Sequence, residues 1–228
     1  GDHSDIMMML NCGWIILFAN SVQMVYDYNL IGLKLAEAVN LPVAVAFDGF
    51  FTSHQKRRCM IFADDQDVQD YVGPVRKRTD ILDTEHPVTI GSYMNEPDLI
   101  NNKYQLHEAM EQALNEIEPL FEEFEELSGR PQHRVETYRA EDAAVVIFAL
   151  GSTFHTLKEA VDQLRKEGIE AGAATLTMIR PFPKAKLIEK ICADFNAENP
   201  DIVVDPVYTG NYDDTVTKIQ TAIQGGTP

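Results

Sequence analysis

Residues 14–54, WIILFANSVQMVYDYNLIGLKLAEAVNLPVAVAFDGFFTSH, decide the fold class of this chain. Trp14–Phe18 is a short apolar run, which is typical of a strand buried on both faces. After it, Ser21 can cap a helix that runs to about Ala38, in which apolar residues recur every three or four positions. Leu41–Phe47 then predicts a second buried strand. Strand, helix and strand in this order predict an α/β fold, in which helices cover a largely parallel sheet.

The loop after the second strand is the first candidate for a functional site, because ligands of such sheets bind outside the carboxyl ends of the strands. Asp48, Ser53 and His54 lie in this loop. A histidine there can orient a substrate carbonyl or carboxylate, or donate a proton near neutral pH. One histidine on one loop does not define a reaction, so these residues predict a site without naming its chemistry.

A polar turn, Asp2-His3-Ser4-Asp5, precedes the first strand and is the second candidate. Its serine, histidine and aspartates do not form a catalytic triad, because the members of a triad converge from separate segments. The turn is either an incomplete metal site, which needs a ligand from elsewhere in the chain, or a hydrogen-bonded polar loop. We favour the polar loop.

The middle of the chain carries its clearest helix, Lys103–Leu127, with one apolar stripe and eight glutamates at other positions. We interpret the acidic face as solvated; the alternative is a surface for a metal or a cationic partner. Ser128 and Gly129, followed by Pro131, end this helix. The end of the helix marks a domain boundary.

A second α/β unit follows. Ala144–Leu150 predicts a buried strand, Gly151-Ser152-Thr153 a tight turn onto a helix, and Ala171–Ile179 another strand. This βαβ unit is right-handed by default. Backbone N–H groups near Ser152 can hold an anion at the start of the helix. Most such turns, however, only connect the strand to the helix and cap the helix.

Charge and cysteine usage exclude several classes of function. The 228 residues contain 19 Lys and Arg against 36 Asp and Glu, which gives a net charge of −17. This surplus repels phosphate backbones and anionic lipids, so we expect neither nucleic acid nor a membrane as a partner. Cys12, Cys59 and Cys192 are scattered, without the spacing of a zinc or iron–sulfur site, and they favour a reducing compartment. No apolar run approaches the ~20 residues that span a bilayer.

Several short motifs occur together in one order along the chain: Gly1-Asp2-His3-Ser4-Asp5, Cys12-Gly13-Trp14, Ser21-Val22-Gln23, Asp48-Gly49-Phe50 with Ser53-His54, Val72-Gly73-Pro74, Gly151-Ser152 and Arg180-Pro181-Phe182-Pro183. In this order they resemble the α subunit of pyruvate (2-oxoacid):ferredoxin oxidoreductase over residues 1–188. The resemblance implies a fragment of the pyrimidine-binding domain of thiamine enzymes, followed by a βαβ domain like the C-terminal domain of transketolase.

The resemblance also implies an activity: oxidative decarboxylation of pyruvate or a related 2-oxoacid to an acyl-CoA, with electrons passed to ferredoxin. Thiamine diphosphate would be shared with a partner subunit, and Mg²⁺ and the iron–sulfur clusters would lie on partner subunits. The expected partners are the other subunits and, through the complex, ferredoxin and CoA. The expected location is the cytoplasm.

In this family the first domain closes over the cofactor and helps to seat the substrate carboxylate. Carried onto this chain, the resemblance implies a pocket wall made by Asp2, His3, Ser4, Asp5, Gly13, Asp48, Ser53 and His54. None of these is assigned as a catalytic residue or a metal ligand.

Two departures from the family pattern affect this expectation. Leu10 and Cys12 stand where the family's R-x-T-G motif has Arg and Thr, so a charge for anion recognition is missing and the substrate or turnover is in question. The glutamate that activates the cofactor would lie upstream of residue 1. We therefore expect the isolated chain to be inactive.

The expected domains are residues 1–130, the C-terminal part of a pyrimidine-binding-like domain with its acidic helix; residues 131–190, an incomplete second α/β domain; and residues 191–228, an atypical tail. The tail resembles the first lobe of an extracellular solute-binding protein of ABC transporters, with a junction near residues 187–192; a chance helix–strand–helix pattern is the alternative there. Two other functions therefore stay open: a solute-binding module, and a non-catalytic α/β interaction fragment.

Overall fold

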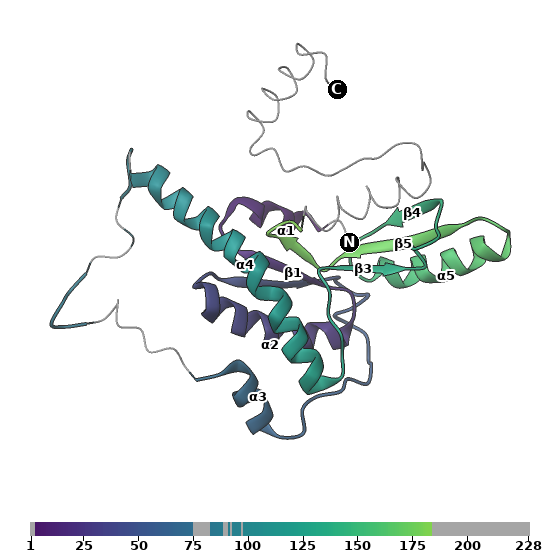
Figure 1. The fold of residues 1–228 in the computed structure, drawn as a ribbon, viewed down its shortest axis with the longest axis horizontal. Helices are drawn as coiled ribbons and strands as arrows, with labels where there is room; N and C mark the ends of the chain where they lie inside the picture. Colours follow the sequence, from purple (N-terminus) through teal and green to yellow (C-terminus); the bar gives the residue numbers. More distant parts are fainter. Residues whose placement is uncertain (1–2, 75–82, 89–90, 92, 97, 184–228) are drawn as a thin grey trace, which may run out of the picture. The chain divides into compact units, whose positions relative to one another are not determined.

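The computed structural model describes residues 3–74, 83–88, 91, 93–96 and 98–183, all within the compact unit Gly1–Pro183. The whole atypical tail, residues 191–228, lies outside the described residues. The elements in chain order are α1 (Ser4–Met8), the 3-10 helix η1 (Met9–Asn11), β1 (Ile15–Ala19), α2 (Val22–Val39), β2 (Val43–Phe47), α3 (Asp65–Val72), α4 (Asp98–Ser128), β3 (Val135–Tyr138), β4 (Val145–Phe148), α5 (Thr153–Lys166), β5 (Ala171–Leu176) and β6 (Met178–Arg180) (Figure 1).

The first sheet has the strand order β2-β1-β6, and β1 pairs with β2 in parallel, as the sequence predicts. Every residue of β1 is buried. Ile15 and Leu17 pack into the core formed with α2 and α4, whereas Ile16 and Phe18 pack into a smaller cluster near α1. Because successive side chains of a strand point to opposite faces, the run of apolar residues fills two cores at once.

The helix predicted after β1 is confirmed as α2. The Ser21 hydroxyl accepts a hydrogen bond from Met24 N at 3.2 Å, which is the expected cap. The helix ends at Val39, and Asn40 follows in a left-handed conformation with φ 57°. The cap fixes where the chain turns after leaving the carboxyl end of β1.

The long acidic helix is also confirmed, as α4, but it begins at Asp98 and therefore earlier than expected. It ends at Ser128, where Gly129 takes the left-handed φ of 68° that the sequence predicts. The helix crosses α2 (Figure 1) and is in contact with it. Its apolar stripe contributes these buried residues: Met110, Ala113, Ile117, Leu120, Phe121 and Phe124. Pro119 lies inside the helix and does not end it.

The second sheet has the order β3-β5-β4, with β4 and β5 parallel and α5 between them in the chain. The predicted βαβ unit is therefore confirmed. The prediction of one strand over Ala171–Ile179 is wrong, because the segment divides at Thr177. Its second part, β6, pairs antiparallel with β1 in the first sheet. Residues beyond 170 thus complete a sheet that begins near residue 15.

The prediction that β2 and β4 are buried is also wrong. Both are edge strands of their sheets, and Val145 and Phe148 of β4 are exposed. Only the central strands β1 and β5 are buried along their whole length. An apolar run therefore identifies a strand but does not show whether it has neighbours on both sides. No helix in the described part of the chain has both the length and the apolar character needed to cross a membrane.

Candidate functional site

The two polar segments singled out from the sequence meet at the carboxyl edge of the first sheet. His3 Nε2 lies 3.3 Å from Asp48 Oδ1. The His3 ring also packs edge-on against Phe18, with 4.8 Å between ring centroids. Asp48 directly follows the end of β2 and is only 4% exposed. A buried carboxylate requires polar partners, and the turn before β1 supplies one of them.

A third segment reaches the same carboxylate. The backbone N–H of Ser152, in the turn between β4 and α5, donates to Asp48 Oδ2. Gly151 in that turn has φ 63°, and a Cβ placed on it would lie 2.2 Å from Asp48 Oδ2. The close approach therefore requires glycine at this position. Asp48 ties together three loops that are far apart in the sequence.

The other predicted site residues are not all at this point. Asp5 is exposed in α1 and accepts from Ile6 N at 2.7 Å, and Ser4 begins the same helix. Ser53 Oγ accepts from Phe50 N at 3.0 Å and lies 2.7 Å from His54 Nδ1; both residues are exposed.

Gly13 precedes β1, whereas Asp48 follows the parallel strand β2. The two residues therefore lie at opposite ends of the parallel strands, Gly13 at the amino ends and Asp48 at the carboxyl ends. Gly13 is buried, and Leu106 of α4 would be 3.2 Å from a Cβ added to it. Asp2 lies outside the described residues. The structure thus joins His3 with Asp48 and leaves Gly13 away from them.

A cavity of about 600 Å³ opens beside this edge, between the loop after β2 and the first turns of α2 and α5. Its lining includes Thr52, Arg57, Arg58 and His155, which sequence reasoning did not select. The available signal was the basic run Lys56-Arg57-Arg58 directly after the predicted loop, in a chain with strongly negative net charge. The cavity is therefore the concave surface at the carboxyl ends of these strands, and the exposed residues Ser53 and His54 do not line it.

His155 stands in the wall of the cavity, near the start of α5. Partial loss of solvent and the positive charge of Lys158 lower its pKa below the ordinary value of 6.5, and Arg57 acts in the same direction. The negative charge of Glu136 and a hydrogen bond with the backbone of Asn20 oppose this lowering of the pKa without cancelling it. The ring is therefore mainly neutral at pH 7 and offers hydrogen bonds rather than charge.

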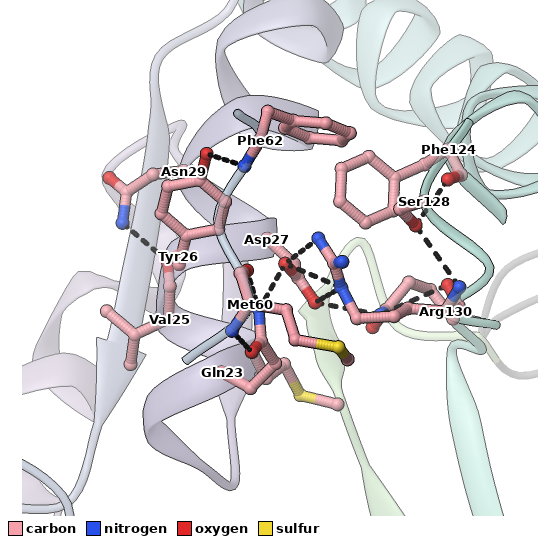
Figure 2. Close-up of polar contacts among 12 residues, drawn as sticks. Gln23, Val25, Tyr26, Asp27, Asn29, Met60, Phe62, Phe124, Ser128 and Arg130 are labelled. Carbon is pink, nitrogen blue, oxygen red and sulfur yellow. Dashed lines mark hydrogen bonds and ion pairs between the residues drawn. The ribbon is translucent and has the colours of Figure 1, made fainter. Parts of the chain in front are cut away.

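The segment that carries the two arginines is fixed to α2 by a double hydrogen bond. Gln23 Nε2 donates to Met60 O at 2.9 Å, and Met60 N donates to Gln23 Oε1 at 2.7 Å. Gln23 Nε2 also donates to Asp27 Oδ1 at 3.0 Å. Figure 2 shows this clamp between the helix and the segment at Met60. The clamp orients a stretch of chain that otherwise contains mostly exposed residues.

Asp27 is itself held by a buried ion pair. Arg130, just beyond the end of α4, donates to Asp27 through Nε and Nη2 at 2.9–3.2 Å (Figure 2). Asp27 is 1% exposed and the Arg130 side chain 13%. The guanidinium also lies over the rings of Phe62 and Phe124, 5.6 and 5.3 Å from their centroids. The chain of contacts from Arg130 through Asp27 to Gln23 therefore couples the core to the cavity.

Leu10, at the family's arginine position, lines a second cavity of about 760 Å³. Lys103 and Arg180 line the same cavity, so cations stand near the place where that arginine is missing. Arg180 Nε is buried and has no hydrogen-bond partner among the described residues. Cys12 is exposed, with its Sγ 3.8 Å from Met8 O. Among the described residues, no three His, Cys, Asp or Glu side chains lie together as a metal site.

Two family models match the chain. Residues 1–122 match the thiamine diphosphate-binding domain of pyruvate flavodoxin/ferredoxin oxidoreductase. Residues 143–224 match core domain II of pyruvate:ferredoxin oxidoreductase. The second match covers most of residues 191–228 and assigns them to the same oxidoreductases, in place of a solute-binding protein. The α/β fold is thus that of a thiamine diphosphate enzyme.

Named relatives agree with this assignment. Pyruvate synthase subunit PorA from Thermotoga maritima is 43% identical over 190 residues, which are 82% of this chain and 48% of the relative. Ketoisovalerate oxidoreductase subunit VorA from Pyrococcus horikoshii is 34% identical over 189 residues, with the same coverage. The chain spans about half the length of these curated relatives. The solved structure of a 2-oxoglutarate:ferredoxin oxidoreductase from Magnetococcus marinus aligns with 94% of this chain, and the alignment takes up 37% of the solved chain. The two chains are 18% identical with a TM-score of 0.48, which is too distant to inform the site.

Proposed function

The chain belongs to the thiamine diphosphate-binding family of pyruvate flavodoxin/ferredoxin oxidoreductases, and on that premise we propose that it forms one wall of the pocket in which a 2-oxoacid is oxidatively decarboxylated. The observation that carries this proposal is the meeting of His3, Asp48 and Ser152 at the carboxyl edge of the first sheet. This is the edge at which α/β proteins bind their ligands. His3 and Asp48 form the centre of the proposed wall, which also keeps Asp2, Ser4, Asp5, Ser53 and His54 from the family resemblance. Gly13 is left out of it, because it lies at the opposite ends of the parallel strands.

The chemistry of this pair fits a wall that orients a ligand. His3 Nε2 contacts Asp48, which leaves Nδ1 to bond a substrate or cofactor atom. Asp48 in turn is fixed by the Ser152 N–H, so the ring has a defined position. Fixed dipoles of this kind stabilise charge that develops in a reaction without having to reorganise. Bound thiamine diphosphate would supply the electron sink for the decarboxylation.

The remaining components of the enzyme belong to the same proposal. Thiamine diphosphate is shared with a partner subunit, and Mg²⁺ and the iron–sulfur clusters lie on partner subunits. The product is an acyl-CoA, with CoA and ferredoxin engaged through the complex. Pyruvate is the first substrate to test, because the pyruvate synthase relative is more similar than the ketoisovalerate one. The free thiols of Cys12 and Cys59 support a cytoplasmic location.

We propose a first domain to residue 130, a second to residue 190 and a tail to residue 228. The family matches to residues 1–122 and 143–224 support a change of domain near residue 130. Strand β6 nevertheless returns to the first sheet, so the two domains share structure.

Replacing Asp48 by asparagine in the enzyme assembled with its partner subunits tests the proposal. We expect kcat/KM for pyruvate-dependent ferredoxin reduction to fall at least about tenfold, because a charge-assisted hydrogen bond that orients His3 contributes about 1.5–3 kcal/mol. His3→Gln should cause a similar loss. The double variant should be little worse than either single one, because both substitutions remove the same interaction.

Asp142→Asn is the matched control, since it makes the same chemical change at an exposed carboxylate paired with Arg165 outside the site. It should leave the reaction unchanged. Wild-type kinetics in the assembled Asp48→Asn enzyme, with normal assembly, would contradict the proposal.

A further inference from the structure

We propose that Gln23 is a positioning residue for the reaction, because it fixes the segment that carries Arg57 and Arg58 in the wall of the cavity at the carboxyl edge. The inference rests on the proposed function, since it concerns the same pocket. Gln23 is the last residue of the motif Ser21-Val22-Gln23. The serine of this motif caps α2, and the cap does not need the glutamine. The contacts of the Gln23 side chain therefore point to a separate role.

Gln23 supplies hydrogen-bond partners to the backbone of this segment. Residues 55–62 form neither helix nor strand. The Gln23 amide bonds both the N–H and the C=O of Met60, as a residue on a neighbouring strand would. Tyr26 lies three residues further along α2, on the same face, and its hydroxyl accepts from Phe62 N at 3.3 Å. Two side chains of one helix face therefore hold the segment at two alternate residues.

The Gln23 amide has one orientation that suits all its partners. Its Nε2 donates to Met60 O and to Asp27 Oδ1, at 2.9 and 3.0 Å, and its Oε1 accepts from Met60 N. If the amide were turned end for end, its oxygen would face two acceptors and its NH₂ group would face a donor. Asp27 is held by Arg130 (Figure 2), so the orientation is anchored in the core and does not depend on the segment.

The position of Met60 decides where the two arginines stand. Arg57 and Arg58 shortly precede Met60 in the chain, and both line the cavity. Arg57 Nε donates to Gln55 Oε1, another group of the lining, at 3.0 Å. The 2-oxoacids of the proposed reaction are anions, and in a chain with a net charge of −17 these two cations attract them to the pocket. Because the attraction falls as the charges move apart, a loosened segment weakens substrate binding.

Gln23→Met in the enzyme assembled with its partner subunits tests the inference, because methionine keeps the length of the side chain but cannot donate to Met60 O. We expect KM for pyruvate to rise at least about fivefold and kcat to fall less than about twofold, since substrate binding is weakened while His3 and Asp48 stay in contact. Gln66→Met is the matched control. Gln66 bonds the aspartate four residues ahead, as Gln23 does, but it does not line the cavity. Its variant should leave both constants unchanged.

A triple variant distinguishes positioning from a merely structural role. The double variant Arg57→Gln and Arg58→Gln lacks the charges that Gln23 places, so its KM should rise at least as much and Gln23→Met should raise it no further. Additive increases in KM, an unchanged KM in either the Gln23→Met enzyme or the double variant, or a loss confined to kcat would overturn the inference. A wild-type enzyme without pyruvate-dependent activity would instead refute the proposed function.

Hydrogen exchange of the full chain tests the positioning step without relying on activity. The Met60 N–H donates to Gln23 Oε1, so its exchange rate reports whether the clamp is closed. In Gln23→Met this amide should exchange at least about tenfold faster, as expected for a local opening that has lost its hydrogen bond. Gln66→Met should leave the rate unchanged. If the Met60 amide exchanges equally fast in the wild type and in Gln23→Met, Gln23 does not fix the segment, and the inference fails while the proposed function stands.

Discussion

The Asp27→Asn variant will have a free energy of unfolding about 3 kcal/mol below that of the wild type, because it leaves the Arg130 guanidinium buried without its counter-charge. Asp27 accepts hydrogen bonds from Gln23, Arg130 and Gln132, all with donor–oxygen distances of 3.4 Å or less. An asparagine has an NH₂ group in place of one carboxylate oxygen. This group can only donate, so it would face the N–H donors that now bond that oxygen and would lose those hydrogen bonds. Urea denaturation followed by circular dichroism measures the loss.

The size of this effect depends on burial, and a second ion pair in the chain shows why. Asp142 is 69% exposed and contacts Arg165 with an N–O distance of 2.6 Å, shorter than the contacts of Asp27. Despite that distance, Asp142→Asn should hardly change the unfolding transition, because an exposed carboxylate gains little from its ion pair and Arg165 keeps its hydrogen bonds to Ala171 O and Arg139 O. Equal midpoints for the two variants would refute the view that Asp27 and Arg130 stabilise the core.

Much of the fold could be predicted because its strongest signals are local. The apolar run before Ala19, the cap at Ser21 and the glycine at position 129 each act within a few residues, and the structure confirms the elements they predict. The division at Thr177 could not be predicted in the same way. Thr177 N donates to Arg134 O, and Phe18 N donates to Thr177 O, so its conformation depends on partners from two distant segments.

The site shows the same limit. Asp48 is predicted because it follows a strand at the ligand edge, whereas His3 enters the predicted site only through the family resemblance. The structure places the two residues in contact. The ion pair between Asp27 and Arg130 cannot be predicted from local sequence, since the two residues are separated by 103 positions. An aspartate on an apolar helix face was the only local sign that a buried cation was required. Sequence patterns locate such a residue, but its partner emerges only from tertiary packing.

Gly151→Ala will lower the free energy of unfolding by about 3 kcal/mol and displace the Asp48 carboxylate. Alanine at φ 63° costs about 1 kcal/mol in backbone energy. The rest arises because its Cβ would occupy the space of Asp48 Oδ2, which is 2.2 Å away, and so separate the carboxylate from the Ser152 N–H. The same unfolding measurement tests this prediction.

Two matched variants separate the backbone cost from the clash. Gly168→Ala also forces alanine to a positive φ, 84°, but nothing lies within 4 Å of its Cβ, so it should lose only about 1 kcal/mol. In an Asp48→Ala background the carboxylate is gone, and Gly151→Ala should then cost no more than Gly168→Ala does. If Gly151→Ala costs the same with and without Asp48, the glycine does not serve the carboxylate. The contact between the second α/β unit and the edge of the first sheet would then have to depend on other groups.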